Sequence, residues 1–321
     1  MVQAINLAFH QEMTKDNRVV VMGQDVGVDG GVFRVTDGLK QKFGKERVMD
    51  TPLAESGIVG AATGMAIAGL RPVAEIQFDG FSYLMLDQLE ANASRYRTRS
   101  RGMFTVPLVV RMPYGGGVRA LEHHSESKEA FYAHIPGLKT VIPSTPRNAR
   151  ALLLAAIRDP DPVVFMEPKR LYRAFKEEVP DEEEVMEIGK ARIVSEGEDI
   201  TVISWGAMLH ETQKVIDEIV DRRGASIELI DLLTIAPMDG QAIGKSVDKT
   251  GRCVIVQEAQ KTLGPASEII AQINDRAFMS LQAPVGRVTG YDVVMPYFAR
   301  EEMYLPTQGR IRRAIEATLD F

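Results

Sequence analysis

Two stretches of the sequence carry side chains that could move protons. Glu55 lies in the run DTPLAESGIVGAATGMAIAG, and His124 lies in the loop sequence PYGGGVRALEHHSES. A glutamate in the first turn of a helix is favoured by the helix dipole and needs no function. A buried carboxylate could instead share a proton with a nitrogen base, because burial favours the neutral acid. His123 and His124 are either two surface histidines or include a side chain that exchanges a proton near neutral pH.

The element next to Glu55 is expected to be a helix over residues 56–68. Thr51-Pro52 suits a helix entry, because the first turn needs no amide donor from proline. The helix is rich in small residues, and each interior glycine costs roughly 1 kcal/mol relative to alanine. We therefore expect another helix or a ligand to approach this face closely. The small residues are Gly57, Gly60, Ala61, Ala62, Gly64, Ala66 and Ala68.

The histidine loop is expected over residues 113–125, directly after a buried strand at 108–112. Its three successive glycines, Gly115 to Gly117, would let the loop adjust around a bulky substrate arm. No third ligand follows the two histidines at a spacing that is typical of zinc sites.

Apolar strands alternate with helical segments along the chain, which predicts parallel sheets covered on both faces. Strands are expected at 18–22, 71–78, 139–142 and 163–167, with a long helix at 83–97. The acidic stretch 177–187 is expected to be a solvated linker or surface ribbon. Beyond it, a second series has strands at 200–204, 226–231, 253–257 and 285–289. We expect two α/β domains, residues 1–185 and 186–321.

Composition excludes several classes of protein and site. A net charge of −6 over 321 residues argues against nucleic acid or an anionic membrane surface as the main partner. The single cysteine, Cys253, excludes a disulfide framework, and its apolar neighbours predict a buried thiol. No stretch approaches the roughly 20 apolar residues that a membrane span needs. Residues 1–13 are typical of an amphipathic helix rather than a signal peptide, so a cytoplasmic location is expected.

The sequence TPLAESG, followed by G-x-x-x-G-M-A-x-A-G and RPVAEIQFDGF, resembles the β chain of thiamine-diphosphate-dependent 2-oxo acid dehydrogenases. IPSTPRNARALLLAAIRDPDPVVFMEP, SWGAM and VIVQEA extend the resemblance over nearly the whole chain. It implies a thiamine-diphosphate pyrimidine-binding domain followed by a transketolase-like C-terminal domain, both with mainly parallel sheets.

The resemblance also implies roles for individual residues. Glu55 would hydrogen-bond the aminopyrimidine nitrogen and relay the proton that activates the cofactor. Phe81 would contact the aminopyrimidine and Gln77 would line the same pocket, although an aromatic residue at a strand end is often simply part of the core. His124 would donate a proton when the acyl unit passes to a lipoyl group.

A potassium site is implied near the segment AAIRDPDPVV. Helix C-terminal carbonyls have spare acceptor capacity, although a helix end followed by a turn needs no ion. The family often has asparagine where this chain has Asp161. The implied ligands are Leu108, Ala156, Ile157, Asp159 and Asp161.

The sequence lacks the Gly-Asp-Gly motif through which thiamine enzymes hold the diphosphate and magnesium. In the family the α chain supplies this motif, so the resemblance implies a cofactor shared with an α chain and a magnesium ion held by that chain. It implies a heterotetramer with two of each chain, active only with the α chain, that serves a lipoyl acyltransferase core.

The expected reaction is decarboxylation of a 2-oxo acid followed by reductive acylation of a lipoyl domain. The segments GGVFRVTDGL and AEIQF resemble both branched-chain enzymes and bacterial pyruvate enzymes. We expect a branched-chain 2-oxo acid as the substrate, with pyruvate as the close alternative. Half of a transketolase-like enzyme is a second possibility, although the chain is too short to contain the diphosphate domain. A non-catalytic structural subunit is a third, which the presence of Glu55 and His124 disfavours.

Overall fold

The computed structural model describes residues 1–321 and divides the chain into two compact units. The first unit contains Met1–Tyr114 and Phe131–Ile188, and the second contains Gly115–Ala130 and Gly189–Phe321. The loop that carries His124 therefore groups with the C-terminal part of the chain. Apart from this loop, the division falls between Ile188 and Gly189, and the domain boundary near residue 185 stays a prediction. None of the helices combines the length and the apolar character that crossing a membrane requires.

The first unit is built on a parallel sheet with the strand order β5-β6-β4-β3-β1-β2. Its four central strands are mostly apolar and almost entirely buried, as expected when helices cover both faces of a parallel sheet. The strands are β1 (Val19–Gly23), β2 (Val48–Asp50), β3 (Arg71–Glu75), β4 (Val109–Tyr114), β5 (Lys139–Val141) and β6 (Val163–Pro168).

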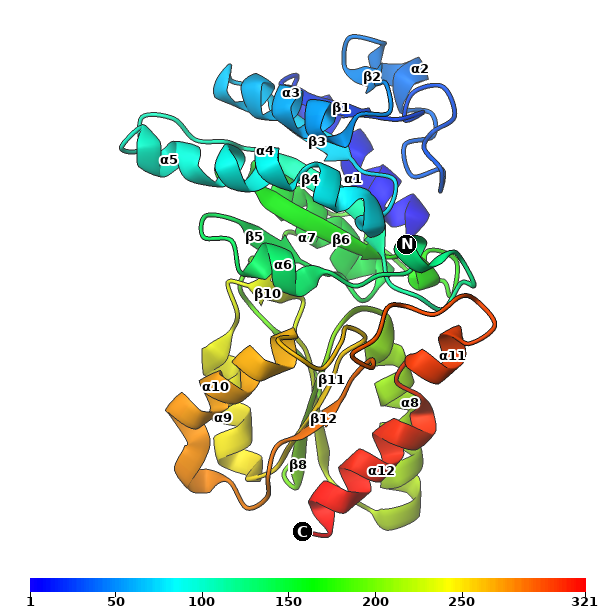
Figure 1. The fold of residues 1–321 in the computed structure, drawn as a ribbon, viewed down its shortest axis with the longest axis vertical. Coiled ribbons are helices and arrows are strands. Elements are labelled where there is room, and N and C mark those ends of the chain that lie inside the picture. The colour runs from blue at the N-terminus through cyan, green and yellow to red at the C-terminus, as the bar shows by residue number, and fades with distance from the viewer. The chain divides into compact units, whose positions relative to one another are not determined.

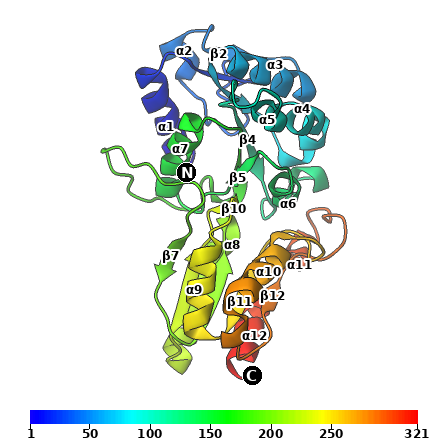
Figure 2. The ribbon, with the colours of Figure 1, turned by 90° about the vertical axis from the view of Figure 1, so that its left-hand side faces the viewer.

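Helices cover this sheet on both sides (Figure 2). On one side, α1 (Val2–Lys15) packs against α7 (Pro146–Arg158). On the other side lie α3 (Glu55–Ile67), α4 (Leu86–Ala91) and α5 (Tyr96–Arg99). The short helix α2 (Leu39–Phe43) precedes β2.

The second unit has a smaller sheet with the order β12-β11-β8-β9-β7, parallel except for the pairing of β7 with β9. Helices α9 and α10 cover one face and α8 and α12 cover the other (Figure 1). The strands are β7 (Arg192–Ser195), β8 (Ile200–Ser204), β9 (Ile227–Asp231), β11 (Cys253–Val256) and β12 (Gly286–Val288), with a short β10 (Thr234–Ala236) after β9. The helices are α8 (Gly206–Arg223), α9 (Gly240–Thr250), α10 (Pro265–Ala277), α11 (Glu301–Tyr304) and α12 (Gln308–Leu319).

These elements confirm the predicted α/β architecture with mainly parallel sheets and correct some of its details. The strand expected at 71–78 ends at Glu75, and the long helix expected at 83–97 is broken. In its place the chain forms a 3₁₀ helix η1 (Asp79–Leu84), then α4, then η2 (Ala93–Arg95) and α5.

The acidic stretch 177–187 has no helix or strand, but it is not simply solvated. Glu183 pairs with Lys15 and with Arg158, whose Nη1 lies 2.9 Å from its Oε1. Hydrogen bonds from Arg158 and then Lys15 lower the pKa of Glu183 to about 2. Arg147 pairs with Glu184 at 2.6 Å. Through Glu183, the stretch therefore connects α1 with α7 by ion pairs.

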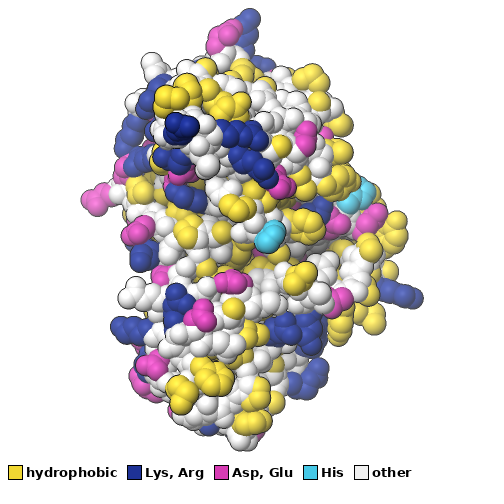
Figure 3. Space-filling model, turned by 60° about the vertical axis from the view of Figure 1, so that its left-hand side comes forward, with side chains coloured by type: hydrophobic (Ala, Val, Ile, Leu, Met, Phe, Trp, Pro, Cys, Tyr) yellow, Lys and Arg dark blue, Asp and Glu magenta, His cyan; other side chains and the backbone are white.

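On the face shown in Figure 3, basic and acidic side chains are interspersed, with hydrophobic side chains between them.

Candidate active site

Glu55 is the first residue of α3, which begins shortly after the carboxyl end of β2. Ligands of parallel α/β sheets bind at the carboxyl ends of the strands. The residue is only 4% exposed, and no hydrogen bond or ion pair within the chain engages its carboxylate. Its oxygens are not among the fully buried polar atoms that have no partner, so they reach solvent. A donor from outside the chain, such as a ring nitrogen, can therefore approach the carboxylate.

The small residues of α3 face two different surroundings. On one side a side chain at Gly60 would meet Gln88 of α4 at 3.3 Å, so the glycine permits close helix packing. On the same face, one turn away, Gly57, Ala61 and Gly64 are exposed, and no atom lies within 4 Å of a β-carbon built on Gly64. The close approach that we expected from the sequence is therefore found for α4 at Gly60, and the neighbouring part of this face stays uncovered within the chain.

Phe81 lies in η1, which packs against α3, so the chain brings the element of Phe81 to the element of Glu55. Its ring meets that of Phe78 edge to face, with 5.8 Å between centroids. The start of η1 is fixed by Asp79, which is 1% exposed and accepts a 2.6 Å hydrogen bond from the Tyr132 hydroxyl. Gln77 is half-buried in the turn between β3 and η1. Both predicted pocket residues thus follow the carboxyl end of β3.

His124 is the last residue of the 3₁₀ turn η3 (Glu122–His124), in the loop of the second unit. Its ring lies 4.6 Å, centroid to centroid, from the ring of His123. His123 in turn places Nδ1 3.3 Å from a carboxylate oxygen of Glu122. Both histidines are half-buried. The two predicted proton-transfer residues, Glu55 and His124, therefore belong to different units.

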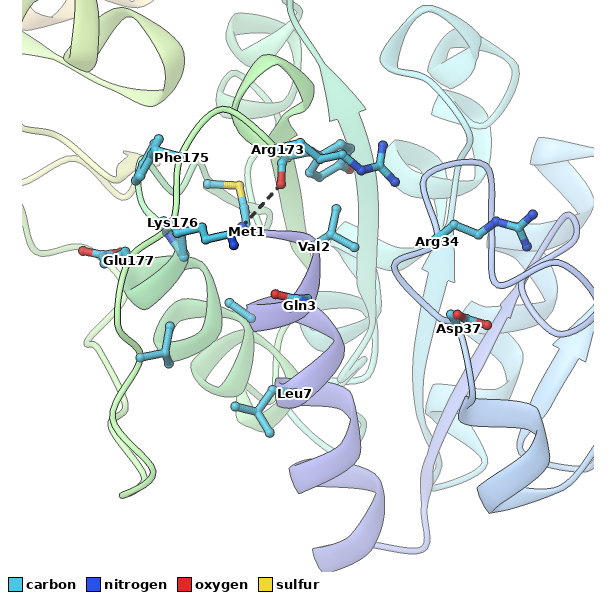
Figure 4. Close-up of a pocket in the computed structure, with 14 residues that line it drawn as sticks. Met1, Val2, Gln3, Leu7, Arg34, Asp37, Arg173, Phe175, Lys176 and Glu177 are labelled. Carbon is cyan, nitrogen blue, oxygen red and sulfur yellow. Dashed lines mark hydrogen bonds between the residues drawn. The ribbon is translucent and has the colours of Figure 1, made fainter.

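The pocket in Figure 4 lies apart from the predicted site residues of the first unit. It has a volume of about 670 Å³ and lies in the first unit between the start of α1, the loop with Arg34 and Asp37, and the segment from Arg173 to Glu177. Its lining mixes basic, acidic and apolar side chains and contains none of the predicted site residues. The pocket therefore contributes nothing to the candidate active site.

Comparison with known proteins identifies the families that the chain resembles. Residues 1–174 match the family described as "Transketolase, pyrimidine binding domain", and residues 189–311 match "Transketolase, C-terminal domain". The chain is 53% identical over 311 residues to the "Pyruvate dehydrogenase E1 component subunit beta" of Acholeplasma laidlawii, covering 97% of this chain and 95% of the relative. It is 50% identical to the protein of that name from Bacillus subtilis, over 100% of this chain and 98% of the relative. The chain belongs to the β-subunit family of the 2-oxo acid dehydrogenases.

The fold of this β chain is also that of a solved structure named "Split gene transketolase, inactive beta4 tetramer". The two align with a TM-score of 0.79 over 99% of this chain and 97% of the other, at 20% sequence identity. The likeness confirms the predicted transketolase-like, two-domain fold.

The oxygens predicted to bind potassium in the β chain already have donors of their own. The carboxylates of Asp159 and Asp161 face Lys139 and Arg97, each at 2.6 Å, so two cationic side chains occupy the position of a counter-ion. The backbone oxygens of Ile157, Leu108 and Ala156 accept from Arg71 at 2.7 Å, from the Val163 amide at 2.9 Å and from the Asp159 amide at 3.3 Å. Each backbone oxygen keeps a second lone pair, so these contacts do not decide whether an ion binds. No cluster of three or more acidic, histidine or cysteine side chains in the chain could hold a metal. Potassium binding stays a prediction.

The sequence analysis missed a buried ionic cluster in this β chain. Arg111 of β4 is 1% exposed and donates two 2.6 Å hydrogen bonds to Glu167 of β6 and one to Glu75 of β3. Tyr172 adds a 2.6 Å hydrogen bond to Glu167. Burial, opposed by Arg111, raises the pKa of Glu75. The signal in the sequence is a charged residue in or at the end of each of three apolar runs, LVVRM, RPVAE and VVFME.

Proposed function

We propose that this chain is the β chain of a pyruvate dehydrogenase, which acts with an α chain in a heterotetramer with two of each. The α chain would hold the diphosphate and magnesium, and the two chains would share thiamine diphosphate. The reaction is decarboxylation of pyruvate followed by acetylation of a lipoyl domain on the acyltransferase core. The names of the relatives favour pyruvate over the branched-chain 2-oxo acid that the sequence analysis favoured.

The observation that carries this proposal is the buried carboxylate of Glu55, which has no donor within the chain. In a family that uses an aminopyrimidine cofactor, a ring nitrogen supplied from outside would share a proton with this carboxyl group. Thiamine diphosphate supplies the electron sink for decarboxylation when it is bound. Glu55 would hold a proton against the ring nitrogen, where its exclusion from water strengthens the interaction. Phe81 and Gln77 would line the same pocket, since both follow the adjacent strand end.

His124 would act later, as the proton donor when the acetyl group passes to the lipoyl group. A histidine suits this step, because its pKa lies near neutrality. The exposed stripe of Gly57, Ala61 and Gly64 on α3 supports the need for a second chain, since small residues allow another backbone to approach closely.

The test is co-expression with a candidate α chain that contains a Gly-Asp-Gly motif, followed by an assay of 2-oxo acid decarboxylation with an artificial electron acceptor. We expect Glu55→Gln to lower kcat on the order of 100-fold or more, the usual contribution of general acid–base catalysis. Glu46→Gln is the matched control, since Glu46 is an exposed glutamate of the same unit. Wild-type activity in Glu55→Gln would remove the proton-relay role.

Two further assays separate the other parts of the proposal. The kcat/KM for pyruvate should exceed that for a branched-chain 2-oxo acid by roughly 10-fold or more, because a pocket fitted to a methyl group rejects added methylenes. The opposite order would restore the branched-chain alternative. In His124→Ala, acetylation of a lipoyl domain should fall more than turnover with the artificial acceptor. Equal losses in both assays would contradict the donor role.

A further inference from the structure

Two buried carboxylates of the second unit lie directly beneath the histidine loop, which we define as residues 115–127. Glu258 follows β11, and Glu301 opens α11. They are 5% and 1% exposed. The proposed function gives neither of them a role, yet both accept hydrogen bonds from the loop that carries His124.

Glu301 holds the first part of the loop by its backbone. Its Oε1 accepts a 2.7 Å hydrogen bond from the Gly117 amide, and its Oε2 accepts a 2.8 Å hydrogen bond from the Arg119 amide. Hydrogen bonds to an ionised acceptor are roughly twice as strong as neutral ones. Arg119 adopts a left-handed backbone conformation with φ of 57°, which is unfavourable for a residue with a side chain. The bond from its amide to Glu301 stabilises that conformation five positions before His124.

Glu258 joins the two ends of the loop. It accepts a hydrogen bond from the Gly116 amide at one end and a 3.3 Å hydrogen bond from the Ser127 hydroxyl at the other. A backbone hydrogen bond of 2.8 Å from the Gly115 amide to the Glu126 carbonyl closes the same neck. The segment with His124 is thus closed at its base by Glu258 and held along its length by Glu301.

The loop glycines permit this close contact. A β-carbon at Gly115 would lie 2.8 Å from Oε1 of Glu258. A β-carbon at Gly116 would lie 2.7 Å from the terminal methyl of Met295 and 2.9 Å from Oε1 of Glu301. A β-carbon at either position would displace the ends of these side chains, and φ of 83° at Gly115 also disfavours a side chain, so glycine keeps the loop backbone close to the carboxylates. Gly115 and Gly116 thus have a role in contact with Glu258 and Glu301, and adjustment of the loop around a substrate arm stays a prediction.

We propose that Glu301 is a positioning residue for His124, assisted by Glu258: the two carboxylates fix the backbone of the loop so that the imidazole is presented for proton donation in acyl transfer. This rests on the proposed function for the role of His124, whereas the anchoring of the loop itself does not. Glu301 and Glu258 act through the loop and do not touch the substrate.

The test compares Glu301→Gln with Glu302→Gln in the co-expressed complex. Glu302 is the next residue and is exposed. Its carboxylate pairs with the side chain of Arg119 at 3.1 Å and not with the loop backbone. Glutamine at position 301 keeps the size and one acceptor oxygen but loses the charge and the second acceptor. Hydrogen exchange of the Gly117 and Arg119 amides should then become faster by on the order of 10- to 100-fold, as expected for a lost hydrogen bond to a charged group. Glu302→Gln should leave exchange unchanged.

Activity supplies the second readout. In Glu301→Gln, kcat for acetylation of a lipoyl domain should fall on the order of 10-fold, while KM for pyruvate and turnover with the artificial acceptor stay near wild type. Unchanged exchange at Gly117 and Arg119 would overturn the anchoring. Faster exchange with unchanged acetylation would overturn the positioning role.

Gly116→Ala perturbs the same contact from the side of the loop and should reproduce both effects if Glu301→Gln does not fold. His124→Ala is measured in parallel. If it leaves acetylation intact, the role proposed for His124 fails, while the exchange result still decides whether Glu301 anchors the loop.

Discussion

Replacing Arg111 with methionine should destabilise the first unit severely. The guanidinium is buried between Glu75 and Glu167 and forms two 2.6 Å hydrogen bonds with Glu167. Methionine would leave both carboxylates buried without their cation. Removing one partner of a buried ion pair typically costs about 3–5 kcal/mol. For a domain of this size, about 4 kcal/mol corresponds to a fall of roughly 8–16 °C in melting temperature.

The matched control is Arg18→Met. Arg18 also faces a carboxylate, Asp16, with side-chain contacts of 2.7 and 2.9 Å, but its side chain is 55% exposed. An exposed pair contributes little, because solvent and salt screen the charges, so its loss should shift the melting temperature by a few degrees at most. Scanning calorimetry gives the melting temperature of both variants, and so compares the loss of a buried arginine–carboxylate pair with the loss of an exposed one.

The pH dependence of the Arg111→Met variant gives a second check with a definite sign. Burial raises the pKa of Glu75 above its ordinary value of 4.5, and Arg111 opposes that rise. A carboxyl group with a raised pKa in the folded state contributes stability below its ordinary pKa and loses that contribution as pH rises through the folded value. Without Arg111 the rise is larger, so the variant should lose more stability at about pH 8 than at about pH 5.5. A drop no larger than that of Arg18→Met, or one independent of pH, would refute this account.

Two smaller predictions concern buried polar groups. Tyr132→Phe removes the 2.6 Å hydrogen bond to Asp79 and should lower the free energy of unfolding by about 1–3 kcal/mol in urea, whereas Tyr297→Phe, at a residue 61% exposed, should change it little. Burial raises the pKa of the Cys253 thiol well above its ordinary value. Ellman's reagent should therefore leave the native protein unmodified near pH 8 and modify it fully in denaturant. Rapid reaction of the native protein would contradict the burial of this thiol.

Apolar runs in the sequence were sufficient to find the central strands. The run ITVIS forms β8 with the predicted bounds, because a strand buried on both faces reads as a continuous apolar run. The helix expected at 83–97 is broken at Asn92, where φ of −118° and ψ of −75° depart from regular helical values. Asn92 and Ser94, at the break, belong to residue types that favour turns and helix ends over helix interiors. The strands β2 and β10 were missed because a run of three residues is too short to show a period.

The candidate site divides in the same way. Glu55 and His124 were chosen because the motifs around them resemble those of a known family, whereas the residue patterns alone left a structural role open for each. Glu258 and Glu301 could not, since their importance lies in contacts with a loop far away in the sequence. The sequence offers one local signal for Glu258, since this charged residue directly follows the strand run VIVQ.

The hydrogen bonds beneath the histidine loop join residues 142 and 184 positions apart. During synthesis at roughly 5–20 residues per second, the amide of Gly117 therefore exists for about 10–40 seconds before its acceptor on Glu301 has been made. Until then, water must satisfy the loop amides that the two carboxylates later bind. The loop with His124 can reach its final form only when almost the entire chain has been translated, although most of the first unit precedes it along the sequence.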